Sequence, residues 1–392
     1  MNFPRSKWLL PLALIALSGC ASTDSERSAF VPSSSLSGAP NRVPARDKVL
    51  WEYRAGLDAL RRADFAAARE NLDDATLTLG GIFGDKEGRK ARSYFSGENK
   101  KTFIGEPYER VMAYYYRGIL YWMDGEPDNA RACFRTAQIQ DSDTENKEYS
   151  SDYAILDYLD GLATAKLGGD GSDAFKRAQE ECKFGKPAVI PPKSNVLVFM
   201  EWGESVKKYA TGQYHEELRF SPGSSPVRGA TVKVQSQNVQ VLPYDDLYFQ
   251  ATTRGGRVMD HILANKAVFK STTDTIGNAA LVSGGVLAAT QQGRHNSGDE
   301  VGLGLLAFGL VSKIVSATTT PTADIRSWEN LPQFISFAGL VMSPGENILT
   351  VEFNDSYGRP ITSLTKTLTI NVPSSGDKVV FVSDHSPASQ RL

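Results

Sequence analysis

Cysteine and histidine are the side chains of this chain that could act most readily as nucleophiles or metal ligands. The four histidines, His215, His261, His295 and His385, lack the short spacing of a metal-binding pair, and no Cys-x-x-Cys motif occurs. The chain also lacks the Gly-x-Ser-x-Gly turn of hydrolases and a phosphate-binding loop before a Lys-Ser or Lys-Thr pair. These patterns predict no catalytic residues, no metal site and no cofactor. An active site built from residues distant in sequence would leave no such pattern.

Cys20 differs from the other candidate residues, because the residues before it form a signal. Arg5 and Lys7 provide positive charge, and an apolar run follows from Trp8 to Leu17, interrupted only by Pro11. A helix of ten residues is about 15 Å long, well short of the roughly 30 Å hydrocarbon core of a membrane. The run is therefore typical of a cleaved signal peptide rather than of a permanent transmembrane anchor.

The sequence Leu17-Ser18-Gly19-Cys20 resembles the lipobox of bacterial lipoproteins. In that family a peptidase cuts before the cysteine, here between Gly19 and Cys20. The thiol then carries a diacylglyceryl group, and the new amino terminus is acylated. Ala21 stands where lipoproteins retained in the inner membrane have aspartate, so the resemblance implies an outer-membrane anchor with the body in the periplasm. The alternative is an ordinary secretory signal in which Cys20 has no role.

The length and composition of the chain indicate two folded domains. The chain has 392 residues, of which 41% are hydrophobic, enough to bury two cores. Its net charge of −2 argues against nucleic acid as a partner. Cys133 and Cys182 could form a disulfide in an oxidising compartment. The expected order is a signal peptide at 1–19, lipidated Cys20 with a Ser-, Pro- and Ala-rich tether at 20–46, a helical domain at 47–186 and a β-rich domain at 187–392.

An internal repeat organises the predicted helical domain. Small and large residues recur in steps of 12, 4 and 3 in two copies, and a third copy is degraded. The spacing resembles the tetratricopeptide repeat, in which small residues let two helices pack closely. The copies start 62 and then 43 residues apart, whereas that family repeats every 34 residues, so insertions separate the units. The repeated positions are Gly56, Ala68, Leu72 and Ala75, then Gly118, Ala130, Phe134 and Ala137, then Gly161, Ala174 and Ala178.

Aromatic residues on the first helix of the second copy are the candidate partner-binding residues, namely Tyr114, Tyr115, Tyr121 and Trp122. The resemblance implies a peptide-binding face lined by first helices. Because consecutive residues point in different directions around a helix, at least two of the five aromatic residues between 114 and 122 are expected in the core. A basic, aromatic insertion at about 76–109 is interpreted as a solvated loop, with contact to an acidic partner as the alternative.

After Pro187 the pattern changes to short segments of strand-forming residues separated by turn residues. We therefore expect an α+β protein whose second domain is an antiparallel, sandwich-like β structure. The expected strands lie at 195–201, 230–234, 239–242, 247–252, 348–353, 363–372 and 379–382.

An insert at about 258–317 interrupts the β-rich domain. Small residues recur at helical spacing along two apolar arms, which predicts a tightly packed helical hairpin. We interpret this hairpin first as buried structure. The alternatives are self-association of several copies into a homo-oligomer and insertion into the membrane. The candidate self-association residues are Gly277, Ala280, Gly284, Ala288, Gly302 and Gly309.

Asp324, Arg326, Trp328, Leu331 and Pro332 form the pattern Asp-x-Arg-x-Trp-x-x-Leu-Pro. With the lipobox, the helical repeats and the insert, this motif resembles a family of uncharacterised bacterial outer-membrane lipoproteins. From residue chemistry alone we expect an ion pair between Asp324 and Arg326, Trp328 at the edge of a core, and a strand after Pro332.

The functional prediction is a non-catalytic, lipid-anchored periplasmic scaffold that docks a protein partner of a cell-envelope assembly. One alternative is an oligomeric, pore-like component assembled through the small-residue insert. The other is a glycan- or peptidoglycan-related binding protein or enzyme.

Overall fold

A computed structural model describes residues 43–83, 102–142, 149–187, 190, 193–235, 237–253 and 322–392. All of them belong to one compact unit, which spans residues 40–392. Within the described ranges six α-helices come first, and the strands follow with one further short α-helix among them. The predicted α+β class, with helices towards the N-terminus and strands towards the C-terminus, is confirmed.

The first six helices form three pairs that are adjacent in sequence. They are α1 (Lys48–Arg61) with α2 (Phe65–Phe83), α4 (Pro107–Met123) with α5 (Pro127–Asp141), and α6 (Ala154–Lys166) with α7 (Ser172–Glu181). Proline opens both α4 and α5, where a missing backbone N–H costs no helical hydrogen bond. A capping box formed by Glu106 and Glu109 also marks the start of α4. These local signals explain where the second pair begins.

Glycine allows the two helices of a pair to approach closely. A Cβ atom on Gly56 would lie 2.9 Å from Cγ of Leu72, and one on Gly118 would lie 2.5 Å from Cε1 of Phe134. Both distances are too short for real atoms, so any larger residue would push the helices apart. The glycine and the large residue that share a copy in the sequence are therefore in contact across each of these two pairs.

The strands form two larger sheets and one ribbon. The first sheet has the order β10 (Lys378–Ser383), β1 (Val196–Trp202), β7 (Phe334–Leu340) and β6 (Asp245–Asp246). The second has the order β11 (Ser389–Arg391), β9 (Lys366–Val372), β8 (Gly345–Asn354), β4 (Gly229–Val234) and β5 (Gln237–Val241). The ribbon pairs β2 (Lys207–Thr211) with β3 (Glu217–Ser221).

Two strand pairs depart from the antiparallel arrangement expected from sequence. β1 runs parallel to β10, and β9 runs parallel to β11, while the other pairs are antiparallel. A parallel pair needs a long crossover connection, and the chain between β1 and β10 is long enough to make one. The sheets are therefore mixed.

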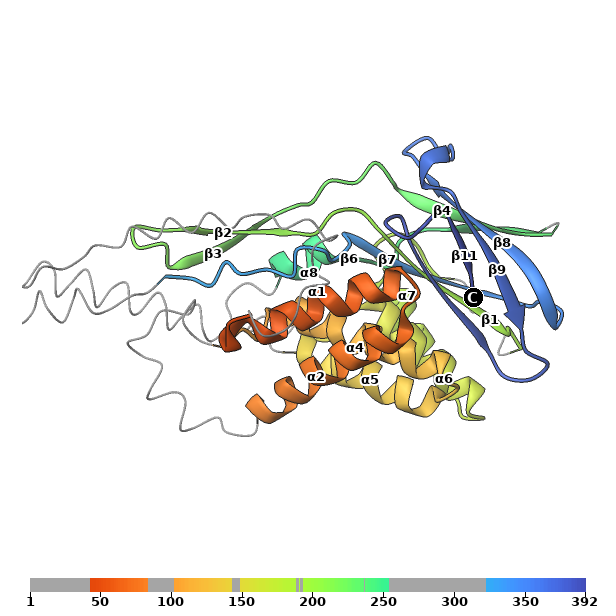
Figure 1. Cartoon of the computed structure of the whole chain (residues 1–392), viewed down its shortest axis with the longest axis horizontal. Coiled ribbons are helices and arrows are strands. Elements are labelled where there is room, and N and C mark those ends of the chain that lie inside the picture. Colours follow the sequence, from red (N-terminus) through yellow and green to blue (C-terminus); the bar gives the residue numbers. More distant parts are fainter. Residues whose placement is uncertain are drawn as a thin grey trace, which may run out of the picture. The chain divides into compact units, whose positions relative to one another are not determined.

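The first sheet is the middle of three layers, with the helices on one face and the second sheet on the other (Figure 1). Leu197 and Phe199 of β1 belong to the core shared with the helices, whereas Val198 and Met200 belong to the core shared with the second sheet. Successive side chains of a strand point to opposite faces, so both faces of β1 are covered. This explains why every residue of β1 is buried. The helical segment and the first sheet thus share one hydrophobic core.

One predicted strand is wrong. Residues 247–252 lie in a short helix, α8 (Leu247–Thr253), instead of a strand. The aromatic run suggested a strand, but the carboxylate of Asp246 accepts a hydrogen bond from the backbone N–H of Tyr248 at 2.9 Å. A side-chain acceptor at this position starts a helix, and so the local capping interaction prevails over strand propensity.

Candidate functional site

The first helix of each pair lies against the chain's own first sheet. α1 and α4 contact β10, and α6 contacts β7 (Figure 1). The second helices present their other faces outward: α5 buries only Ala130, Phe134, Ala137 and Asp141. The first helices, which were expected to offer a peptide-binding face, therefore use much of that face to bind the sheet.

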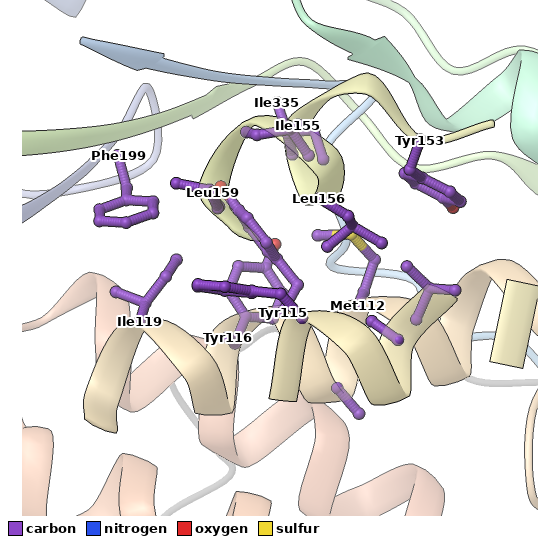
Figure 2. Close-up of a cluster of buried hydrophobic side chains, with 14 of the residues drawn as sticks. Met112, Tyr115, Tyr116, Ile119, Tyr153, Ile155, Leu156, Leu159, Phe199 and Ile335 are labelled. Carbon is purple, nitrogen blue, oxygen red and sulfur yellow. The ribbon is translucent and has the colours of Figure 1, made fainter. Parts of the chain in front are cut away.

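Two of the four candidate partner-binding residues are part of this interface. Tyr115 and Trp122 are each 1% exposed, and their rings lie 6.3 Å and 6.4 Å from the ring of Phe199 in β1. Figure 2 shows Tyr115 pointing into a cluster formed by α4, α6 and the sheet. The indole Nε1 of Trp122 donates a hydrogen bond of 2.9 Å to Asp377. The expectation that at least two of these aromatic residues belong to the core is confirmed.

Tyr114 and Tyr121 remain partly exposed on α4. Arg117 lies between them in sequence, and spacings of three and four residues place all three side chains on one side of the helix. The guanidinium carbon of Arg117 lies 3.5 Å from the ring centroid of Tyr121, and its Nε donates to Asp73 of α2 at 2.5 Å. Partial burial raises the pKa of Tyr114, so its hydroxyl stays protonated at neutral pH. We call Tyr114, Arg117 and Tyr121 the α4 stripe.

The two described cysteines are free thiols rather than a disulfide. Cys133 lies in α5 and Cys182 follows the end of α7. Burial raises the pKa of Cys133 to about 11, and burial also raises the pKa of Cys182. A thiol that stays protonated at neutral pH is a poor nucleophile.

A buried polar cluster joins α1 and α4 to β1. The carboxylate of Glu201 accepts a hydrogen bond of 2.7 Å from Nε of Arg61 and one of 2.5 Å from the hydroxyl of Tyr116. Burial and the carboxylate of Glu201 raise the pKa of Tyr116 well above its ordinary value, so the phenol keeps the proton that it donates. Nη2 of Arg61 also lies 2.6 Å from the same carboxylate, as an ion pair. Its arrangement suits it to fastening the helices to the sheet.

Glu109 forms a second connection, between α4 and the residues that carry the Asp-x-Arg-x-Trp motif. Its side chain is fully buried and accepts hydrogen bonds from Nζ of Lys208 at 2.5 Å, the backbone N–H of Trp328 at 2.7 Å and that of Glu106 at 2.7 Å. We call residues 322–333 the strap. Glu109 holds the strap and β2 against the start of α4.

The strap confirms the local predictions made for its motif. Arg326 and Asp324 form an ion pair of 2.6 Å, and Arg326 also pairs with Asp47 at 2.6 Å. Trp328 is fully buried, and its ring stacks on Tyr53 with 4.4 Å between centroids. β7 then starts at Phe334, two residues after the proline of the motif. The motif is a structural corner that packs against α1.

Asp245 connects the first sheet to the start of α6. Its carboxylate accepts hydrogen bonds from the backbone N–H groups of Ala154 at 3.0 Å and Ile155 at 2.9 Å. Burial raises the pKa of Asp245 to about 7. Sequence reasoning missed Asp245, Glu109 and Glu201. For Glu201 a signal was present, because it is a single acid inside an apolar strand.

A cavity of about 270 Å³ lies between β5, β7 and the loop after α7. Its lining is mostly apolar and includes Phe184, Ile190, Val241, Leu242 and Ala338, with Lys186 as a charged residue. Such a space could admit a small apolar group. Cys182, singled out from sequence as a possible disulfide partner, also lines it, and none of the candidate partner-binding residues does.

The remaining predicted residues lie outside the described part of the chain. They are Gly19, Cys20 and the candidate self-association residues Gly277, Ala280, Gly284, Ala288, Gly302 and Gly309. Among the residues that are described, no helix has both the length and the apolar character to cross a membrane. The same residues contain no group of three or more His, Cys, Asp or Glu side chains placed to hold a metal ion.

No family model, curated protein or solved structure matches this chain.

Proposed function

We propose that this protein is a lipid-anchored, non-catalytic scaffold that holds a protein partner of the cell envelope at the outer membrane. The observation that carries the proposal is the α4 stripe. Tyr114 and Tyr121 stay accessible while their neighbours Tyr115 and Trp122 are committed to the core. Apart from Met123, the other residues of α4 are buried, so these two partly exposed rings offer a contact surface for another protein.

The chemistry of the stripe supports this role. Tyrosine is enriched among the residues that contribute most to protein–protein binding. Arg117 itself is buried and supports the ring of Tyr121. Arg117 is held by Asp73 and lies over Tyr121, so these side chains have little rotamer freedom left to lose on binding. Such a surface binds at a lower entropic cost than flexible side chains would.

We further propose that the three helix pairs are divergent tetratricopeptide-like repeats and that the two larger sheets form a sandwich-like unit. The contacts of Gly56 with Leu72 and of Gly118 with Phe134 support the first statement. The core shared by β1, β4 and β8 supports the second. Membership in the lipoprotein family rests on the lipobox at Cys20 and on the strap motif.

The test is a crosslinking pull-down from intact cells, with the lipidated protein as bait. The test variant carries Tyr114→Ala and Tyr121→Ala, and the control carries Tyr357→Ala, because Tyr357 is 81% exposed in the β8–β9 connection. We expect the test variant to lose at least one crosslinked protein that wild type and control both retain. Identical sets of crosslinked proteins from all three would contradict the proposal, provided that their unfolding midpoints agree.

A further inference from the structure

The first residues of three described ranges lie close together in space. These are the described ranges that begin at residues 43, 102 and 322. The backbone N–H of Phe103 donates to the carbonyl of Arg46 at 2.7 Å, and Arg326 pairs with Asp47 at 2.6 Å. The guanidinium of Arg326 also lies 5.4 Å from the ring centroid of Phe103. The point where the N-terminal tether joins the body is therefore next to the start of the strap.

The β2–β3 ribbon lies at the same place. Nζ of Lys208 in β2 donates to the carbonyl of Arg326 at 3.0 Å, and the backbone N–H of Ala323 donates to the carbonyl of His215 at 2.8 Å. His215 is in the turn that joins the two strands of the ribbon. Figure 1 shows the ribbon and the first residues of the strap side by side, projecting away from the two larger sheets.

Exposed side chains of this region have a composition that suits a membrane surface. Tyr209 is 46% exposed and Ile325 is 53% exposed. Lys207 is also exposed, as is Arg219, which lies opposite Tyr209 in the ribbon and forms an ion pair of 2.8 Å with the exposed Glu217. Tyrosine, lysine and arginine favour the interface between hydrocarbon and water, since each combines an apolar body with a polar end. The free energy of an isoleucine side chain falls when the side chain is transferred out of water.

We propose that the β2–β3 ribbon and residues 322–326 form the surface that rests on the lipid headgroups of the bilayer. This inference depends on the lipid anchor of the proposed function. If residues 21–42 behave as the coil expected from their composition, they span about 25 Å on average. The tether joins the body at residue 43, next to this surface. A lipid anchor at its other end therefore raises the effective concentration of the membrane near the surface. A weak interfacial contact is then sufficient to orient the body.

The test measures how deeply chosen positions enter a bilayer. The full-length, lipidated chain is placed in phosphatidylethanolamine–phosphatidylglycerol vesicles that contain a lipid-borne collisional quencher. Single cysteines at Tyr209→Cys, Ile325→Cys or Tyr357→Cys, each in a Cys133→Ser, Cys182→Ser background, carry an environment-sensitive fluorophore. Tyr357 is the control, because it is the most exposed of these residues and belongs to the β8–β9 connection.

We expect the labels at positions 209 and 325 to shift to the blue and to be quenched several-fold more than the label at 357. Equal quenching at the three positions, with the protein still pelleting with the vesicles, would overturn the surface assignment and leave the anchor intact. A Cys20→Ser variant provides the separate test of the anchor. Undiminished pelleting of that variant would overturn the lipid anchor itself. Circular dichroism of each labelled variant verifies that the fold is retained.

Discussion

At the scale of single residues, buried charged groups specify how the helices sit on the first sheet. Arg61 and Glu201 are 8% and 1% exposed in their side chains, and they come from α1 and β1. Taking two charges out of water costs free energy, and their attraction offsets that cost only when the two groups meet. The pair therefore favours the one arrangement of the layers in which Arg61 contacts Glu201. Tyr116 adds a third element, α4, to the same arrangement.

The first prediction concerns this cluster. Glu201→Gln leaves the guanidinium of Arg61 buried without a counter-charge, and we expect the free energy of unfolding to fall by about 3–5 kcal/mol. Urea unfolding measures the change. The triple variant Arg61→Met, Glu201→Leu, Tyr116→Phe removes every polar member of the cluster and should recover most of the loss. A Glu201→Gln variant as stable as wild type would contradict this account.

The second prediction concerns Asp245 and pH. Burial raises its pKa to about 7 in the folded state, against about 3.9 in an unfolded chain. Between these values the folded state holds a proton that the unfolded state releases. The stabilising contribution of this group is therefore greatest below about pH 4 and is lost as the pH rises to about 7.

Asp245→Asn removes the titrating carboxyl group. The substitution also weakens the hydrogen bonds to the start of α6, but that change in the free energy of unfolding is the same at every pH. We expect the free energy of unfolding of wild type, relative to the variant, to fall by about 2–3 kcal/mol between pH 5 and pH 8. Urea unfolding at the two pH values measures the difference. If the difference between the proteins were the same at both values, Asp245 would not have the raised pKa.

At the scale of elements, the helix pairs depend on glycine at the point of closest approach. The third prediction is that Gly118→Ala destabilises the protein by about 1–3 kcal/mol, because its Cβ would overlap the ring of Phe134. Gly80→Ala is the matched control, since Gly80 lies in α2 with no atom within 4 Å of an added Cβ. The control should be stabilised by about 0.5–1 kcal/mol through helix propensity alone. Thermal unfolding of both variants measures the effect, and equal midpoints would refute the close-packing argument.

At the scale of the whole molecule, the three layers leave separate surfaces for separate tasks. The α4 stripe is on the helical layer, the ribbon and strap are beside Asp47, and the second sheet is on the opposite face of the first. This arrangement is compatible with a body held at a membrane at one end while it binds a protein elsewhere.

The fourth prediction separates this scaffold from the oligomeric alternative. If copies associate through the small-residue insert, Gly284→Leu combined with Gly309→Leu should abolish the oligomers, because leucine would keep the arms apart. Partner capture through the α4 stripe should be unaffected. Light scattering of the detergent-solubilised, lipidated protein measures the mass. Oligomers that persist in this variant would exclude a pore-like assembly formed through the insert.

The fold could be predicted in part from sequence, because much of its information is local. The glycine positions at Gly56 and Gly118 and most of the longer strands follow from residue type and spacing, whereas the helix start at Pro107 falls inside the insertion expected at about 76–109. The two strands of the ribbon were not predicted, whereas β7 was expected as the strand after Pro332. β2 and β3 lie largely outside the apolar cores, so they lack the dense apolar pattern on which the strand assignments relied.

The sequence by itself determined the α+β class, the order of helices and strands, and the local structure of the strap motif, because each depends on residues close together in the chain. Only the tertiary structure decided that Tyr115 and Trp122 face the chain's own sheet while Tyr114 and Tyr121 remain partly exposed. Their contact in β1, Phe199, is about 80 residues away in sequence, and helix periodicity cannot show what will cover a given face. Burial is a property of the packed layers. That is why the accessible stripe became visible only once the helices were placed on the sheet.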